Sequence, residues 1–175
     1  MRKAATWGLF LAWLANDIEE WFTMSRWSKK NAENHRGRGL PGPAWLGQEM
    51  TPIQSRTAIS MMGLLILAAS ARGARTGGES PFFQSALVGF GAHGVGHLAL
   101  SAAYRGYTPG VLTAPAVVIP YSWWAWRELG RAGVPRNTAR AWLGSAVLLP
   151  ASLVTAHYLA HLLTDRSRPT TRGDS

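Results

Sequence analysis

The sequence contains no cysteine and few charged residues. None of its 175 residues is Cys, and only 15% are Asp, Glu, Lys or Arg. The first absence excludes disulfides, thiolate metal ligands and a cysteine nucleophile. The second is unlike a soluble protein, in which about a quarter of the residues are charged. GxSxG and SxxK motifs are also absent, so the sequence does not support serine hydrolase chemistry.

Acidic residues are only half as frequent as basic ones. The chain has 9 Asp and Glu against 18 Lys and Arg, which gives a formal net charge of +9. The basic residues lie between apolar runs and near the chain ends, as is typical of residues that contact phospholipid head groups. They do not alternate with aromatic residues on one polar segment. We therefore expect membrane lipids, and no nucleic acid, as partners.

Hydrophobic residues make up 47% of the chain and include nine Trp. They form five apolar runs, and about 20 helical residues are enough to cross roughly 30 Å of hydrocarbon. We predict an all-α integral membrane bundle of about five transmembrane helices, in one domain over residues 1–165, with a disordered tail over 166–175. The predicted helices cover residues 4–27, 52–71, 81–104, 111–126 and 137–163.

Several local patterns refine this prediction. Segment 28–50 is basic and rich in Gly and Pro, which predicts a loop. Pro115 and Pro120 predict a kinked fourth helix, and Pro150 lies inside the fifth. The apolar run that begins at residue 4 continues beyond any good cleavage site, which indicates an uncleaved first span. Basic residues divide almost equally between the two sides, with a small preference for a cytoplasmic C-terminus. The expected location is a bacterial cytoplasmic membrane.

Three acids stand in the second half of the first apolar run: Asp17, Glu19 and Glu20. A carboxylate in hydrocarbon costs several kcal/mol or more unless it is paired, protonated or bound to a metal, so these acids predict a functional site. Asn16, Glu19 and Glu20 have the spacing i, i+3, i+4 and share one helix face. Asp17, about 100° round the helix from Asn16, is expected to face elsewhere.

Four of the five histidines form two pairs with i, i+4 spacing: His93 with His97, and His157 with His161. This spacing places both rings of a pair on one helix face, where they can bind a metal ion. The acids and both pairs lie in the second halves of the first, third and fifth predicted helices. Because these helices cross in the same direction, the side chains are expected at the same depth.

If those three helices pack together, carboxylates and imidazoles form the ligand set of a dinuclear iron, zinc or manganese site. A divalent ion would also offset the charge of the glutamates. The alternative is a proton relay or an ion-pair network without metal. The expected ligands are the two glutamates, the four histidines and the adjoining amide: Glu19, Glu20, His93, His97, His157, His161 and Asn16.

Two short motifs resemble those of a known family. Asn16-Asp17-Ile18-Glu19-Glu20-Trp21 is similar to the HxxEE signature of the HXXEE-domain family of small integral membrane proteins, and Tyr107-Thr108-Pro109-Gly110 resembles its YxPG motif. A further family histidine would correspond to His93 or His97, and the resemblance covers about residues 9–163. Asn16 stands where the signature has histidine, and an amide binds iron or zinc less well than imidazole does. The resemblance implies architecture rather than a settled activity.

The function predicted from the site is that of a membrane-bound metal-dependent oxidoreductase of the desaturase or hydroxylase type. It would use two irons and an electron donor and act on a lipid or other hydrophobic substrate. Glu19, Glu20 and Tyr107 are the candidate catalytic residues, since the turn at Tyr107 is expected on the side of the site. One alternative is a zinc-dependent hydrolase or isomerase with a glutamate as general base. The other is a non-enzymatic proton or metal-ion pathway.

Overall fold

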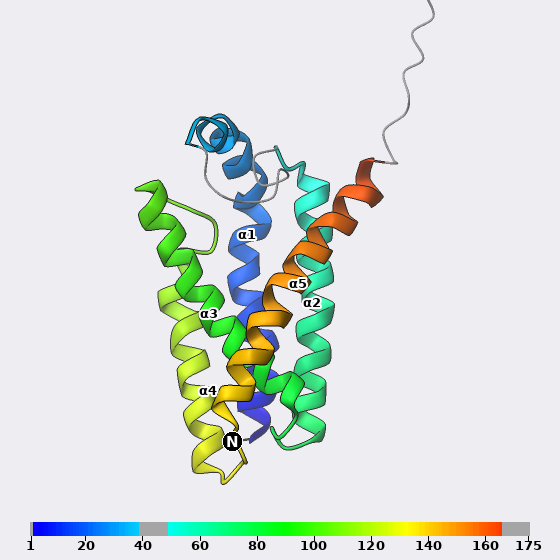
Figure 1. The fold of residues 1–175 in the computed structure, drawn as a ribbon, viewed down its shortest axis with the longest axis vertical. Coiled ribbons are helices and arrows are strands. Elements are labelled where there is room, and N and C mark those ends of the chain that lie inside the picture. The colour runs from blue at the N-terminus through cyan, green and yellow to red at the C-terminus, as the bar shows by residue number, and fades with distance from the viewer. Residues whose placement is uncertain (1, 39–48, 166–175) are drawn as a thin grey trace, which may run out of the picture.

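A computed structural model describes residues 2–38 and 49–165, and this part of the chain is helical, with no strand. The helices are α1 (Arg2–Arg38), α2 (Pro52–Arg75), α3 (Pro81–Tyr104), the π-helix η2 (Ala114–Val118), α4 (Ile119–Arg131) and α5 (Thr138–Asp165). Helices α1, α3 and α5 run in one direction along the bundle, and α2 and α4 run in the other (Figure 1). The predicted all-α class is confirmed.

By length and composition, three described helices are able to cross a membrane: α2, α3 and α5. The expected number of about five is not met by these criteria. In α1 the apolar residues are interrupted by acids and followed by several basic residues. Helix α4 is too short, with 13 residues.

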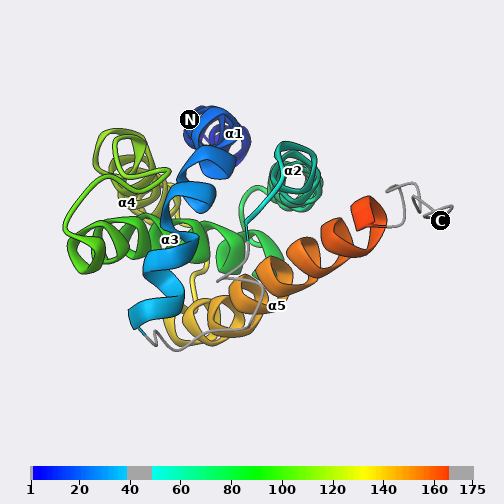
Figure 2. The same cartoon turned by 90° about the horizontal axis from the view of Figure 1, so that it is seen from above.

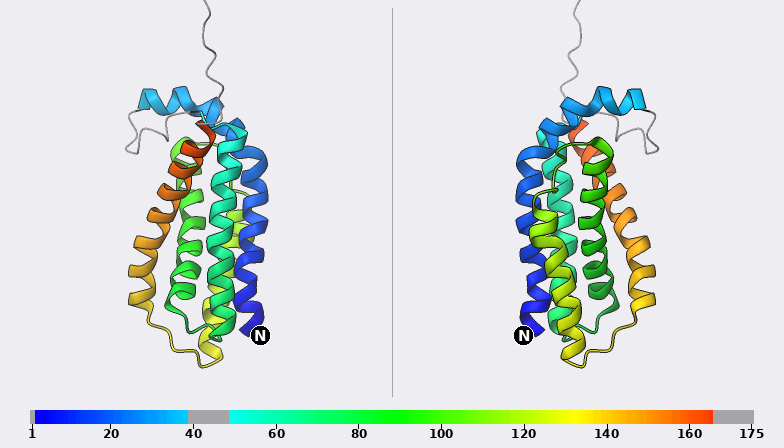
Figure 3. Two further views of the ribbon diagram at one scale, coloured as in Figure 1. Left: turned by 90° about the vertical axis from the view of Figure 1, so that its right-hand side faces the viewer. Right: turned by 90° about the vertical axis from the view of Figure 1, so that its left-hand side faces the viewer.

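Helix α1 is longer than the sequence predicts. It was expected to end near residue 27 but continues to Arg38, and its last part lies across the end of the bundle (Figure 3). The hydroxyls of Thr23 and Ser28 donate to the carbonyls of Glu19 and Ser25, at 2.7 and 3.0 Å, and such bonds bend helices. Part of the expected 28–50 loop is therefore helical. Its remainder over 39–48, like the expected disordered tail over 166–175, lies outside the described residues.

Side-chain caps fix where α2 and α3 begin. Thr51 Oγ1 accepts from the N–H of Gln54 at 3.2 Å, and the Gln54 side chain accepts from the N–H of Thr51 at 2.9 Å, which is a capping box. Ser80 caps α3 through the N–H of Phe83. Arg105, in the left-handed conformation, ends α3 and directs the chain into the turn that carries the second motif.

The fourth predicted helix is irregular, as its two prolines predict. Pro115 lies in η2 and Pro120 in the first turn of α4. Neither has an N–H to donate, so regular α-helical hydrogen bonding cannot run through both positions. The irregular helix begins at Ala114 rather than near residue 111, because residues 111–113 belong to the turn that contacts α1.

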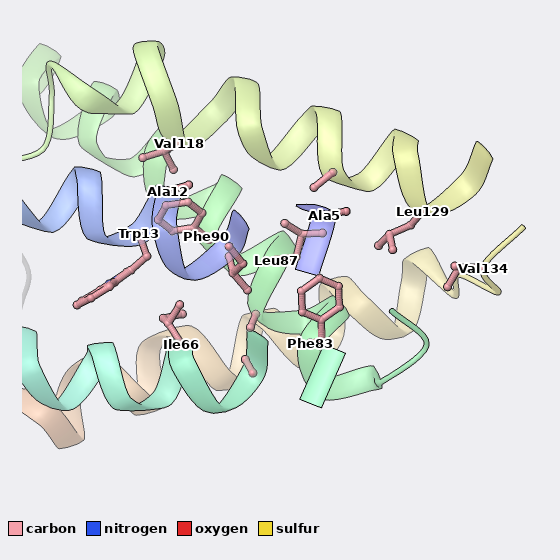
Figure 4. Packing of buried hydrophobic residues seen from close by; sticks show 14 of the residues in the cluster. Ala5, Ala12, Trp13, Ile66, Phe83, Leu87, Phe90, Val118, Leu129 and Val134 are labelled. Carbon is pink, nitrogen blue, oxygen red and sulfur yellow. The ribbon is translucent and has the colours of Figure 1, made fainter. Parts of the chain in front are cut away.

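A buried apolar cluster holds α1 to α4 together, with Trp13, Ile66 and Phe90 pointing into it (Figure 4). Close approach depends on glycine. A Cβ on Gly63 would come 2.6 Å from the Trp13 ring, and a Cβ on Gly94 would come 2.8 Å from Val118. Helix α5 packs on α2 and α3, but among the described residues none of its Cα atoms lies within 8 Å of one in α1. Seen from above, the first part of α1 lies on the opposite side of the bundle from α5, and the last part of α1 crosses over the end of the bundle (Figure 2).

Candidate metal centre

Helices α1 and α3 bring one carboxylate and two imidazoles together. Glu20 Oε1 lies 3.0 Å from His97 Nε2 and 3.7 Å from His93 Nε2, and the two ring nitrogens are 2.9 Å apart. Glu20 and His97 are buried, whereas His93 is partly open on the cavity side. Among the described residues, these three form the one group of His, Asp or Glu donors close enough to share an ion.

The three donor atoms lie close enough together for one metal ion to bond to all of them. They form a triangle with sides of 2.9, 3.0 and 3.7 Å. The circle through its corners has a radius of about 1.9 Å, shorter than the ~2.0–2.2 Å bonds that zinc makes to imidazole and carboxylate. One ion can therefore bond to all three atoms from one side. Two His and one carboxylate leave further coordination positions open, as in catalytic zinc sites and non-haem iron oxygenases.

Asn16 holds the carboxylate of this cluster. It is fully buried, and its Nδ2 donates to Glu20 Oε1 at 3.1 Å and to Asp17 Oδ2 at 3.4 Å. Its carbonyl oxygen, the atom that could bind a metal, lies 3.0 Å from the hydroxyl of Thr113. The amide thus presents its donor group to Glu20 and its oxygen to the 105–113 connection. Asn16 therefore orients the Glu20 carboxylate and does not act as a further ligand beside the two imidazoles.

Glu19 faces the connection between α3 and η2. Its Oε1 accepts from the Tyr107 hydroxyl at 2.8 Å and from the N–H of Leu112 at 3.4 Å. Its Oε2 accepts from the N–H of Thr113 at 3.0 Å and lies 2.7 Å from the Thr113 hydroxyl. Partial burial, together with the hydrogen bond to Glu19, raises the pKa of the Tyr107 phenol, which therefore stays protonated and donates. Glu19 and Tyr107 form a clamp, separate from the histidine pair.

The second motif reaches the cluster through its glycine. Gly110 has φ 82°, a conformation that L side chains rarely adopt, and the ring of His97 lies directly against it. Thr108 is fully buried beneath the turn. The motif thus meets both α1 and α3: Tyr107 contacts Glu19, and Gly110 contacts His97.

The two histidines of the second pair, His157 and His161, lie in different surroundings. His157 lines the cavity beside the cluster, together with Asp17, Glu20 and His93. His161 Nδ1 lies 3.3 Å from Gln54 Nε2, near the start of α2, and does not join the cluster. Of the seven predicted ligands, the structure therefore brings together Glu20, His93 and His97, places Asn16 in contact with Glu20, and puts His157 on the same cavity.

Two polar residues of the site, Asp17 and Thr113, were not predicted from the sequence. The expectation that Asp17 faces elsewhere is wrong, because Asp17 is buried and lines the same cavity as Glu20. Their i, i+3 spacing was the signal, since such residues share a helix face. Thr113, which bridges Asn16 and Glu19, lies in a turn without periodicity, and no sequence pattern indicates it.

Beside the cluster, α1, α2, α3 and α5 line a partly open cavity in which the centres of water-sized groups can occupy ≈ 70 Å³. Most of its lining is apolar and includes Trp13, Ile66, Phe90 and Leu149. A volume of this size holds several water-sized groups. Two members of the three-ligand cluster, Glu20 and His93, thus border an apolar cavity.

A comparison with known protein families gives a match over most of the chain. The family model described as "Protein of unknown function with HXXEE motif" matches residues 7–125, more than half of the chain. This range contains Asn16 to Trp21, the first histidine pair and the turn at residues 107–110. No curated protein and no solved structure matches the chain.

Proposed function

The chain belongs to the HXXEE family, and from this premise we propose that it is an integral membrane, metal-dependent enzyme acting on a lipid or other hydrophobic substrate. The observation that carries the proposal is the convergence of Glu20, His93 and His97 at the wall of an apolar cavity. Histidine and carboxylate ligands suit iron and zinc, and the apolar lining suits a substrate taken from the bilayer.

All five long helical segments cross the membrane in this proposal. Helices α2, α3 and α5 have the required length and apolar composition. The buried acids of α1, Asp17 and Glu20, face the bundle interior rather than lipid. Segments η2 and α4 are continuous over residues 114–131, and the helices lie alongside one another (Figure 3). A bacterial cytoplasmic membrane stays a prediction.

A single ion suits the donors better than two. Both carboxylate oxygens of Glu19 already accept hydrogen bonds from the 105–113 connection. His161 lies near Gln54, away from the cluster. A second ion, as in the predicted dinuclear centre, would have to draw its ligands from the remaining donors on the cavity, Asp17 and His157. We therefore propose one ion on Glu20, His93 and His97.

Iron bound by two His and one carboxylate supports oxidation of substrates by dioxygen, such as hydroxylation or desaturation. The residues of the chain supply the setting for that chemistry. Asn16 fixes the Glu20 carboxylate, and the apolar lining excludes bulk water. His157 and Asp17, on the same cavity, are placed to supply the protons that the reduction of dioxygen to water consumes. An electron donor would complete the reaction.

The position of Asp17 favours a second candidate function. Zinc on the same ligands would lower the pKa of a bound water, and a carboxylate beside the site could act as general base. Asp17 lines the cavity and is not one of the three clustered donors. The reaction would then be hydrolysis or isomerisation of a hydrophobic substrate.

Metal analysis of the detergent-purified full chain, prepared without a metal-affinity step, tests the proposal. We expect about one iron per chain in the natural protein, and loss of it in Glu20→Gln and in His97→Ala. His161→Ala is the matched control, because it removes a histidine from the same bundle but not from the cluster. Zinc in place of iron would favour the second candidate. Metal-free natural protein would contradict both and support the hydrogen-bonded network of the same residues.

A further inference from the structure

The cavity beside the cluster is long and narrow. Along α1 its lining extends from Trp13 to Met24, which is about 16 Å at 1.5 Å per residue. The centres of water-sized groups can occupy only ≈ 70 Å³ along it. So little space over that length suits one extended hydrocarbon chain better than a fused ring system, and we call this space the channel.

Helix packing explains why the channel exists. Among the described residues, no Cα atom of α1 lies within 8 Å of one in α5, yet both helices contribute to its wall. Helices α2 and α3 close the remaining sides. Trp13 crosses from α1 towards α2 beside Ile66, and Phe90 points inward from α3 (Figure 4). The channel therefore lies between these four helices of the bundle.

Polar groups are unevenly distributed along the channel. Glu20 is one helical turn from the Met24 end and about two turns from the Trp13 end. Beyond the cluster, towards Trp13, the wall is formed mainly by apolar residues such as Ile66 and Ala86. Apart from Asp17, which lies next to the cluster, the longer arm of the channel is thus mainly apolar and leads away from the metal ligands.

Basic residues lie just beyond the Met24 end of the channel. Met50, which follows the segment outside the described residues, also lines this end. The exposed side chains of Arg26, Lys29 and Lys30 extend α1 beyond it. Basic residues at this level suit an anionic lipid head group.

We infer that this channel binds a single unbranched acyl chain. Its carboxyl or head-group end lies near Met24 and Met50, its methyl end lies towards Trp13 and Ala86, and a carbon within the chain faces Glu20 and His93. That this carbon is the one that reacts rests on the proposed function, whereas binding of the chain does not.

Bromine-labelled long-chain fatty acids test the inference, because bromine quenches a nearby tryptophan. The contribution of Trp13 is isolated as the difference in fluorescence between the full-length protein and its Trp13→Phe variant. We expect an acid brominated near its methyl end to quench this contribution several-fold more than one brominated near its carboxyl end. An excess of unlabelled acid should reverse the quenching. Equal quenching by the two labels, or none, would overturn the inference.

Two blocking variants narrow the far end of the channel from opposite walls: Ala86→Leu on α3 and Ile66→Phe on α2. Each should abolish the quenching, whereas Ala99→Leu, on the exposed side of α3, should preserve it. Quenching that survives both blocking variants would overturn the inference. Metal content is measured on the same samples. Quenching without metal would contradict only the proposed function, and metal without quenching would contradict only the acyl-chain site.

Discussion

The imidazole of His97 lies so close to Gly110 that a Cβ on that glycine would come 2.6 Å from Nε2. Gly110 belongs to the YxPG-type turn, and His97 belongs to the candidate metal cluster. Gly110 leaves room for the His97 ring, and the backbone of the turn limits where that ring can move. The turn therefore acts as a support for one metal ligand.

Gly110→Ala should reduce both stability and metal binding. The positive φ alone makes alanine unfavourable by about 1 kcal/mol or more, and the added methyl group would displace the His97 ring. Gly133→Ala is a matched control, since Gly133 has φ 71° with nothing within 4 Å of an added Cβ. Thermal unfolding and metal content measure the two effects. Both variants should lower the melting temperature, but only Gly110→Ala should lose metal. Equal metal content would contradict the supporting role of the turn.

Glu19→Gln should destabilise the protein without emptying the metal site. The carboxylate accepts from Tyr107, Leu112 and Thr113, and hydrogen bonds to a charged group contribute about 1.5–3 kcal/mol each. An amide would direct its own N–H groups at some of these donors. Chemical denaturation measures the loss, and Glu20→Gln is the comparison for metal content. If Glu19→Gln lost metal as fully as Glu20→Gln, Glu19 would be the ligand that its sequence position suggested.

Periodicity predicted the centre of the site better than its edges. The i, i+4 spacing of His93 and His97, and the common direction of α1 and α3, were enough to place both rings near Glu20. Spacing on α1 could not show which neighbour covers each side of the helix. Glu19 therefore meets the 105–113 connection instead of the histidines.

The same limit applies to whole helices. Hydropathy predicted the positions of α2, α3 and α5, because each is a continuous apolar run. It ended α1 too early, because helix formation continues through polar residues outside the apolar run. It also could not predict that α5 crosses the bundle obliquely (Figure 1), with His161 near Gln54 and His157 on the cavity.

His157→Ala distinguishes one ion from two. His157 lines the cavity but is not among the three clustered donors, so a single-ion site should keep its metal-to-protein ratio in this variant. A dinuclear site that uses His157 should lose about half of its metal. Metal analysis and mass spectrometry of the intact protein measure the ratio, and His93→Ala should remove the metal in either case. A halved ratio would restore the dinuclear centre predicted from the sequence.

Asn16→His, which restores the family signature, should tighten metal binding. Position 16 is fully buried and one helical turn before Glu20, with its amide nitrogen 3.1 Å from the oxygen that faces both histidines. An imidazole there could add a nitrogen ligand, which suits iron and zinc better than an amide does. We expect Kd to fall by about tenfold or more, as residues that support metal ligands typically change affinity by about 10–100-fold.

Asn16→Ala provides the comparison at the same position. It removes the donor that orients Glu20 and supplies no ligand, so Kd should rise by a similar factor of about 10–100. Competition with a chromogenic chelator measures Kd for the natural chain and both variants. Opposite shifts would show that position 16 acts on the metal through Glu20 and can also supply a ligand. Two unchanged affinities would mean that the asparagine serves only to anchor Thr113 and the turn beside it.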